Sequence, residues 1–362
     1  MTEAEPSTTG ASGQPETMGA RTRVEIGEQP RVLRALVDRA DELATAVRRA
    51  APRPLRGLVL VARGSSDNAA IFGRYVLELA VGVPVVLAAP SLQTRYEVTP
   101  ALEGFLAVGV SQSGRTPEIV STVERLRAGG AATLALTNEA DTPLAASCDA
   151  AVVLGTGPEE AVPATKTFTA QVAAFALLAD ALADVPWRRA DWDAVLDAVE
   201  EVVADAGPAA ALADAVVDAD RVLPVGRGLL LSAALEVGLK LAETTGAAVH
   251  AYSAADLLHG PIATVGPGTL ALCLTAAGPT AQDVRTTADA LAERGAALIG
   301  MGADRDLLPR APRWLPVPAG APEPLATIPY VVRGQQLAER AAVAAGVDPD
   351  RPFDLSKVTP TT

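Results

Sequence analysis

Residues 57–68 read GLVLVARGSSDN, and residues 104–118 read GFLAVGVSQSGRTPE. In each stretch a short apolar run ends in a polar loop that contains Ser and Gly. The spacing of apolar residues predicts a helix after each loop, through Ile71–Leu79 and around residues 119–126. Short buried strands that alternate with helices are typical of a doubly wound parallel sheet. The two stretches therefore predict a protein of the α/β class.

The same alternation continues through the rest of the chain. Further strands are predicted at 82–88, 132–137, 150–155, 221–228, 269–276, 296–302 and 313–319. RVLPVGRG (221–228) resembles LVLVARG (58–64), so we expect a divergent internal duplication with two tandem doubly wound domains. The predicted divisions are a disordered N-terminus (1–20), a first domain (21–187), a second domain (188–345) and a C-terminal tail (346–362). We also expect order from Val24, one helix through Arg31–Arg49, another through Thr167–Leu182, and a last helix after 321–330.

Composition limits the class of protein. Hydrophobic residues make up 49% of the chain and charged residues 20%, which indicates a globular protein. The net charge of −13 disfavours nucleic-acid binding, because clustered Lys and Arg hold phosphate backbones. Cys148 and Cys273 lie far apart in apolar stretches, which suggests core packing and not a metal site. We see no leader peptide or membrane-spanning run, so we expect a cytoplasmic protein that does not bind membranes.

The loop SQSGRTPE (111–118) is the sharpest local motif. It follows a buried strand, and Thr116-Pro117 is good chemistry for the start of a helix. Such a loop offers backbone N–H groups, hydroxyls and a helix dipole to a phosphate. Ser and Gly also make ordinary turns, so the motif alone leaves both interpretations open. No Walker lysine or GxGxxG motif accompanies it, which disfavours nucleotides. The candidate phosphate ligands are Ser65, Ser66, Ser111, Gln112, Ser113 and Thr116.

A second candidate site lies on the helix expected over residues 229–244. Its only charged residues are Glu236, Lys240 and Glu243, which lie within roughly a 60° arc. An exposed helix would use such a stripe as a solvated Glu–Lys ion pair. Since apolar residues cover nearly every other face, the stripe more plausibly lines a polar cavity.

Taken together, these segments resemble the sugar-isomerase (SIS) domain family, and in particular the isomerase half of glucosamine-6-phosphate synthase. The resemblance implies flavodoxin-like, three-layer αβα domains and a homodimer with a shared active site. Within the family, the chain is most similar to stand-alone glucosamine-6-phosphate deaminases of the synthase-like type, because it shares their ARGSSD, VPATK-like and DPDRP…KVT segments. We also expect no glutaminase half. The matching segments are 24–33, 63–68, 111–118, 157–168, 226–244, 251–261 and 348–359.

The resemblance also implies roles for single residues. Glu243 would move a proton between C1 and C2 of a sugar phosphate, and Lys240 would stabilise the enediol-like charge. His259, which alone would pass for a solvated loop residue, would reach in from the partner subunit and open the sugar ring. Lys357 would fold over the substrate from the tail. The serine loops would hold the phosphate, and Glu159 and Val162 would line the sugar.

Three positions depart from the family pattern. Ala248 and His250 stand where relatives usually have His and Glu, and Leu258 replaces a basic residue before His259. These changes bear on substrate identity and on the dimer interface.

The expected activity is deamination of glucosamine 6-phosphate to fructose 6-phosphate and ammonia, with no metal or redox cofactor. One alternative is another enzyme on this scaffold, either a deglycase of sugar-phosphate amine adducts or an isomerase subunit supplied with ammonia by a separate glutaminase. The other alternative is a sugar-phosphate-sensing regulator without catalysis. Regulators of that kind usually carry a helix-turn-helix domain, for which we find no room.

Overall fold

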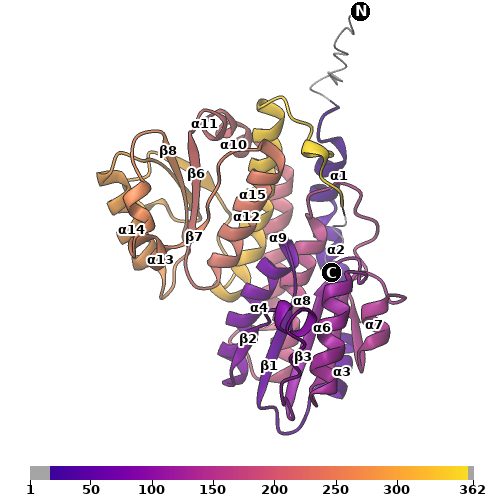
Figure 1. Ribbon diagram of the computed structural model, residues 1–362. Helices are drawn as coiled ribbons and strands as arrows, with labels where there is room; N and C mark the ends of the chain where they lie inside the picture. The colour runs from indigo at the N-terminus through magenta and orange to yellow at the C-terminus, as the bar shows by residue number, and fades with distance from the viewer. Residues whose placement is uncertain (1–16, 358–362) are drawn as a thin grey trace, which may run out of the picture.

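The computed structural model describes residues 17–357 and shows two five-stranded parallel sheets on either side of a central layer of helices (Figure 1). The first sheet has the order β2-β1-β3-β4-β5 and the second β10-β9-β8-β6-β7. When each domain's strands are numbered in chain order, both sheets have the flavodoxin-like order 2-1-3-4-5. The α/β class and the tandem doubly wound domains are thereby confirmed.

The first domain contains the two motif stretches. Its strands are β1 (Gly57–Val61), β2 (Val85–Leu87), β3 (Phe105–Ser111), β4 (Ala132–Thr137) and β5 (Ala150–Val153). Its helices are α1 (Ala20–Gly27), α2 (Gln29–Asp38), α3 (Ala40–Ala50), α4 (Ser65–Val81), α5 (Ser91–Thr94), α6 (Pro117–Ala128), α7 (Pro143–Ser147) and α8 (Lys166–Leu182). β1 and β3 are apolar because both of their faces are covered by helices.

The second domain repeats the pattern. Its strands are β6 (Arg221–Gly226), β7 (Tyr252–Ser253), β8 (Thr269–Leu274), β9 (Ala297–Gly302) and β10 (Arg313–Pro316). Its helices are α9 (Arg189–Ala204), α10 (Gly207–Ala210), α11 (Ala213–Val217), α12 (Leu230–Thr245), α13 (Ala254–Leu258), α14 (Ala281–Glu293) and α15 (Glu323–Ala344). Short 3₁₀ helices lie at Pro261–Thr264, Arg305–Leu307 and Pro352–Asp354. Strand β7 was missed in the sequence, because two residues are too few to show a periodic pattern.

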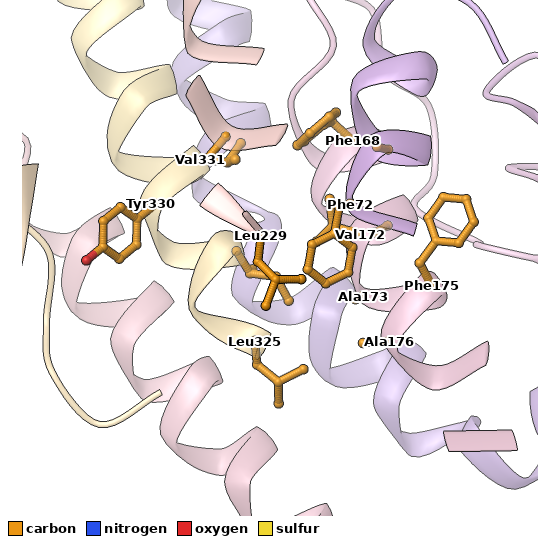
Figure 2. Packing of buried hydrophobic residues seen from close by; sticks show 14 of the residues in the cluster. Phe72, Phe168, Val172, Ala173, Phe175, Ala176, Leu229, Leu325, Tyr330 and Val331 are labelled. Atoms are coloured by element: carbon orange, nitrogen blue, oxygen red, sulfur yellow. The ribbon is translucent and has the colours of Figure 1, made fainter. Parts of the chain in front are cut away.

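One apolar core joins the two domains. The largest cluster of buried residues contains the inner faces of both sheets and the helices between them. Figure 2 shows Phe72 of α4 and Phe168 of α8 in the same region as Leu325 and Val331 of α15. Smaller clusters cover the outer faces, with α6 and α7 on the first sheet and α13 and α14 on the second. Because the central core is continuous, the domains are held in one arrangement, and a site between them has a defined geometry.

The N-terminal region differs from the sequence prediction in two ways. The helix predicted through Arg31–Arg49 is wrong as a single element, because it breaks at Arg39, whose guanidinium donates to the carbonyls of Val153 and Leu154. Order also begins before Val24: α1 starts at Ala20, within the predicted disordered N-terminus, whereas residues 1–16 lie outside the described part of the chain. The division between domains at residues 187 and 188 stays a prediction.

The first helix is held by the C-terminal tail. The Asp350 carboxylate accepts hydrogen bonds from the backbone N–H groups of Arg21 and Thr22 at 2.9 and 2.8 Å, and from the Thr22 hydroxyl at 2.7 Å. These N–H groups lie in the first turn of α1 and have no partner within the helix, so an acidic side chain caps them. A residue far away in the sequence, Asp350, therefore caps the helix, and this contact places the tail alongside the first domain.

Candidate active site

Two polar loops meet at the carboxyl edge of the first sheet, where β1 and β3 are neighbours and their connections leave in opposite directions. In open α/β sheets this switch point is the usual place for a ligand. The loop after β1 leads directly into α4 at Ser65, and the loop after β3 leads into α6 at Pro117. The fold thus brings together the serine loops that the sequence predicted as an anion site.

The loop after β3 is fixed by its own hydrogen bonds. The Gly114 N–H donates to the Ser111 hydroxyl at 3.1 Å, and Ser111 Oγ lies 3.3 Å from Thr116 Oγ1. Gly114 has a φ of +59°, and a Cβ there would lie 2.5 Å from Thr142 Oγ1. Thr116 occupies the N-cap position of α6, as predicted, but its hydroxyl makes no capping hydrogen bond and faces the loop instead. The first turn of α6 is therefore open to an anion.

A cavity of about 390 Å³ opens above these loops. All predicted site residues except His259 and the Glu236 of the charged stripe line it, and they come from both domains and from the tail. The lining residues are Arg63, Gly64, Ser65, Ser66, Val110, Ser111, Gln112, Ser113, Thr116, Ile119, Glu159, Val162, Ala164, Lys240, Glu243, Leu355, Ser356 and Lys357.

Helix α12 of the second domain places its charged stripe against this cavity. Lys240 Nζ lies 2.5 Å from Glu243 Oε2 and 3.5 Å from Glu236 Oε1. The side chains of Glu236 and Lys240 are almost fully buried, whereas 26% of the Glu243 side chain is exposed. Lys240 and Glu243 line the cavity, as the sequence predicted for the stripe, whereas Glu236 is fully buried and does not line it. The interpretation as a solvated ion pair was wrong, because α12 packs between the domains.

Burial and charge act in opposite directions on the stripe. Burial raises the pKa of Glu236 to about 7, against the opposing effects of Lys240 and Asn68. Burial alone would lower the pKa of Lys240, but the carboxylates of Glu236 and Glu243 outweigh it and raise that pKa. Lys240 is therefore an ammonium at neutral pH, held beside the more exposed carboxylate of Glu243.

The tail lysine lies in the cavity wall. Lys357 Nζ donates to Glu159 Oε2 at 2.7 Å and to the Ala161 carbonyl at 2.8 Å. The buried Glu159 carboxylate also accepts hydrogen bonds from the N–H and hydroxyl groups of Thr165 and Thr167. Burial would raise the pKa of Glu159, but Lys357 and the Thr167 donors outweigh it, so the pKa lies below its ordinary value. Glu159 thus anchors the tail as well as lining the cavity.

Arg63 is among the cavity residues that were not predicted as site residues from the sequence. Arg63 donates from Nε and Nη2 to the two carboxylate oxygens of Glu118 at 3.0 and 3.2 Å. This bidentate ion pair joins the loop after β1 to the first turn of α6, so it fixes the distance between the two serine loops. Both residues lie in motifs found in the sequence, Arg63 in RGSSDN and Glu118 in SQSGRTPE, but they stand 55 positions apart and no spacing rule pairs them.

The second domain repeats this framework. Arg227 Nε lies 3.2 Å from Asp283 Oδ2, and this ion pair joins the loop after β6 to the first turn of α14. The pair of Arg63 and Glu118 makes the equivalent connection in the first domain. Thr280 is the N-cap of α14, just as Thr116 is the N-cap of α6. The duplication inferred from the strands therefore extends to the loops.

The donors, however, are present in only one of the two copies. The loop after β6 has two leucines (229–230) where the loop after β1 has two serines (65–66). The loop after β8 reads TAAG (275–278), where the loop after β3 reads SQSG (111–114). The leucines are buried, and Leu229 lies in the central core (Figure 2). The second switch point thus contributes packing between the domains, and the loops that carry hydroxyl donors belong to the first domain.

His259 does not line the cavity. It is exposed and stands at the C-terminal end of α13, on the outer side of the second sheet (Figure 1). Its predicted contribution from a partner subunit stays a prediction. Among residues 17–357, no helix has the length and apolar character needed to cross a bilayer. The same residues contain no cluster of three or more His, Cys, Asp or Glu placed to bind a metal ion.

The arrangement suits proton transfer on a small anion. Hydroxyls, an open helix start and backbone N–H groups surround a space that could hold a phosphate, and two carboxylates and two ammonium groups line the same cavity. The pair of Glu243 and Lys240 could take a proton from carbon and stabilise the negative charge that results.

Comparison with known proteins agrees with this geometry. The SIS domain model matches residues 55–181 and 215–312, one segment in each domain. A glutamine–fructose-6-phosphate aminotransferase from Symbiobacterium thermophilum is 34% identical over 92% of this chain and 58% of its own length. The corresponding enzyme from Methanothermobacter thermautotrophicus is 29% identical over 92% of the chain and 56% of its length. The chain thus spans a little over half the length of these relatives.

Solved structures agree as well. A Silicibacter pomeroyi protein described as a phosphosugar isomerase superposes with a TM-score of 0.79 at 29% identity, over 91% of this chain and 99% of its own. A glucosamine-6-phosphate deaminase from Thermotoga maritima has the same fold, with a TM-score of 0.71 at 22% identity, over 91% and 99% of the two chains. Since the SIS domain model matches both halves of the duplicated fold and more than half of the residues, the chain belongs to the SIS domain family.

Proposed function

We propose that this protein is a glucosamine-6-phosphate deaminase, which converts its substrate to fructose 6-phosphate and ammonia. The observation that carries the proposal is that Glu243 and Lys240 line the same cavity as the two serine loops. A sugar phosphate held by the loops would extend its carbon chain toward α12. The cavity volume of about 390 Å³ suits a ligand of that size.

The proposed reaction is a proton transfer followed by hydrolysis. Glu243 takes the proton from C2 of the open-chain aldose amine, and the electron pair moves toward the C1 carbonyl to give an enaminol. Lys240 stabilises the oxygen charge as it develops. Return of the proton to C1 yields a ketose imine, and water adds to its C2 carbon. Ammonia then leaves, and the ketose phosphate remains.

Two further groups complete the proposed site. Lys357 closes the cavity from the tail, where its ammonium faces the substrate while Glu159 holds it. His259 acts from a second copy of the chain and opens the sugar ring, because it lies outside the cavity of its own chain. The proposed protein is accordingly a homodimer with a shared active site.

The direct test is to incubate the purified protein with glucosamine 6-phosphate and to measure ammonia and fructose 6-phosphate together. Equal amounts of both products are expected. No release at saturating substrate would overturn the proposal. The variant Glu243→Gln keeps the shape of the side chain but cannot accept a proton, so we expect kcat to fall by about 10²- to 10⁴-fold while phosphate binding persists. Near-full turnover would show that Glu243 is not the base.

A second candidate is the reverse reaction, in which fructose 6-phosphate and ammonia give glucosamine 6-phosphate. The names of the relatives favour it, since glutamine–fructose-6-phosphate aminotransferases make the amino sugar. The same residues serve in both directions, because the proton moves between the same carbons. Assays started from each side, with ammonia supplied directly, distinguish the favoured direction. A deglycase would instead release ammonia or amine from sugar-phosphate adducts and not from glucosamine 6-phosphate.

A further inference from the structure

Asn68 joins the phosphate-binding helix to the helix with the charged stripe. Its Nδ2 donates to Glu236 Oε2 of α12 at 2.9 Å, and its backbone carbonyl accepts from the Ser232 hydroxyl of α12 at 2.6 Å. Asn68 lies in the first turn of α4, two residues after Ser66. One helical turn therefore carries both the serine hydroxyls of the cavity and the contact with the second domain.

Burial of the Glu236 carboxylate at this contact carries a desolvation penalty. Its side chain is 0% exposed, and Oε1 has no hydrogen bond, only the Lys240 ammonium at 3.5 Å. An apolar side chain of the same size would fill an interface between helices at lower cost. The raised pKa of Glu236 has the same cause, since burial destabilises its charged form. A role in packing alone does not account for a carboxylate here.

The position of Glu236 explains what the carboxylate does. Glu236 and Glu243 flank Lys240 on one stripe of α12, so the ammonium lies between two carboxylates. Above pH 7, where Glu236 is ionised, its charge opposes the pull of Glu243 on Lys240. Without that charge, Lys240 would pair with Glu243 alone and would compete with its role as a base. Without the Asn68 contact, the stripe would lose its fixed distance from the serine hydroxyls of α4.

We propose that Asn68 and Glu236 form a positioning pair that fixes Lys240 and Glu243 relative to the phosphate-binding loops. This inference rests on the proposed function, because it assigns the pair to the step in which charge develops at C1 and C2. Neither residue lines the cavity, so both act through the residues that do. A displacement of about 1 Å at the reacting groups can reduce a rate by about 100-fold. Loss of the pair is therefore expected to slow the reaction.

The test compares two ligands on wild-type protein and on Glu236→Gln by calorimetry at a pH above 7, at which Glu236 is ionised. Glucitol 6-phosphate probes the phosphate grip alone, and a sugar-phosphate hydroxamate mimics the planar enediolate. Glutamine keeps the size of the side chain and an oxygen for Asn68 but removes the charge opposite Lys240. We expect the variant to bind glucitol 6-phosphate within about threefold of wild type and to lose about 10- to 100-fold in affinity for the hydroxamate. In the activity assay, kcat should fall by a similar factor, with KM within about threefold.

Ser232→Ala is the matched control. It removes the other hydrogen bond between Asn68 and α12 but leaves Glu236 and Lys240 in place. We expect a lower Tm, with hydroxamate affinity and kcat within about twofold of wild type. Equal losses in the two variants, or an unchanged hydroxamate affinity in Glu236→Gln, would overturn the positioning pair. A wild-type protein that binds neither ligand would overturn the proposed function and the pair together.

Discussion

The anchor of the tail lysine gives a prediction whose size follows from the structure. Glu159 Oε1 accepts from the N–H groups of Thr165 and Thr167, whereas Oε2 accepts from the Thr167 hydroxyl and from Lys357. In Glu159→Gln, the amide oxygen would stay with the two backbone donors. The amide NH₂ would then face the Thr167 hydroxyl, which can rotate to accept, and the Lys357 ammonium, which cannot. The substitution therefore acts mainly on the bond to the tail.

The expected loss is that of one charge-assisted hydrogen bond. The Glu159 side chain is 0% exposed and that of Lys357 is 23% exposed, so solvent screens the pair little. Such bonds contribute about 1.5–3 kcal/mol, and we expect the free energy of unfolding to fall by about 2 kcal/mol. Because the released lysine no longer closes the cavity, kcat/KM for glucosamine 6-phosphate should fall by about 10-fold or more.

The assay combines urea unfolding with steady-state kinetics, and the adjacent residue provides the control. Glu160 pairs with Arg21 at 3.5 Å, but their side chains are 65% and 50% exposed. Glu160→Gln should therefore change the free energy of unfolding by less than about 0.5 kcal/mol and leave kcat/KM unchanged. In a double-mutant cycle with Lys357→Met, the two changes at the anchor should show strong coupling. If Glu159→Gln behaved like Glu160→Gln, the anchor would not hold the tail in solution.

The remaining predictions concern the shared site, the buried carboxylate and the anion loop. Mixing the inactive homodimers of Glu243→Gln and His259→Ala should restore about a quarter of wild-type activity, because half of the randomly exchanged dimers have one intact site; no recovery would exclude a shared site. The pKa of Glu236 is raised from 4.5 to about 7, so its stabilising contribution is fully present below pH 4.5 and is lost as the pH rises through about 7. Stability of Glu236→Gln, followed as Tm, should depend less on pH over that range than wild type, and parallel curves would contradict the raised pKa. Gly64 and Gly114 have φ values of +58° and +59°, but only at Gly114 would a Cβ meet other atoms. Gly114→Ala should therefore cost about 1–3 kcal/mol more in unfolding free energy than Gly64→Ala and should weaken binding of glucitol 6-phosphate, whereas equal losses would place the strain in the backbone alone.

Local sequence patterns were sufficient to predict most strands of both sheets and many of the residues that line the cavity. The apolar runs predicted β1, β3 and β8, because a strand covered on both faces must be apolar throughout. The serine loops could be found because a loop after such a strand must lie at the carboxyl edge of the sheet. The stripe on α12 was visible because three charges on an otherwise apolar helix need a polar environment.

The contacts between distant segments could not be predicted in the same way. No spacing rule relates Asn68 to Glu236, Arg63 to Glu118 or the tail to the start of α1. At the break of the first predicted helix, the Arg39 guanidinium donates to the carbonyls of Val153, the last residue of β5, and Leu154, which follows it, and both are more than 100 positions away in the sequence. Such contacts depend on how the domains pack, and hydrophobic periodicity carries no information about their partners.

The sequence by itself determined most of the strands and helices, where the serine loops lie and which helix carries the stripe of two carboxylates and an ammonium. These features follow from local periodicity and from the chemistry of short loops. Only the tertiary structure decided that α12 of the second domain faces the loops of the first, that Glu159 receives the tail lysine, and that His259 lies outside the cavity of its own chain. The physical reason is that a buried charge can be stabilised only by the groups that packing brings within hydrogen-bonding distance, and in this protein those groups come from separate parts of the chain.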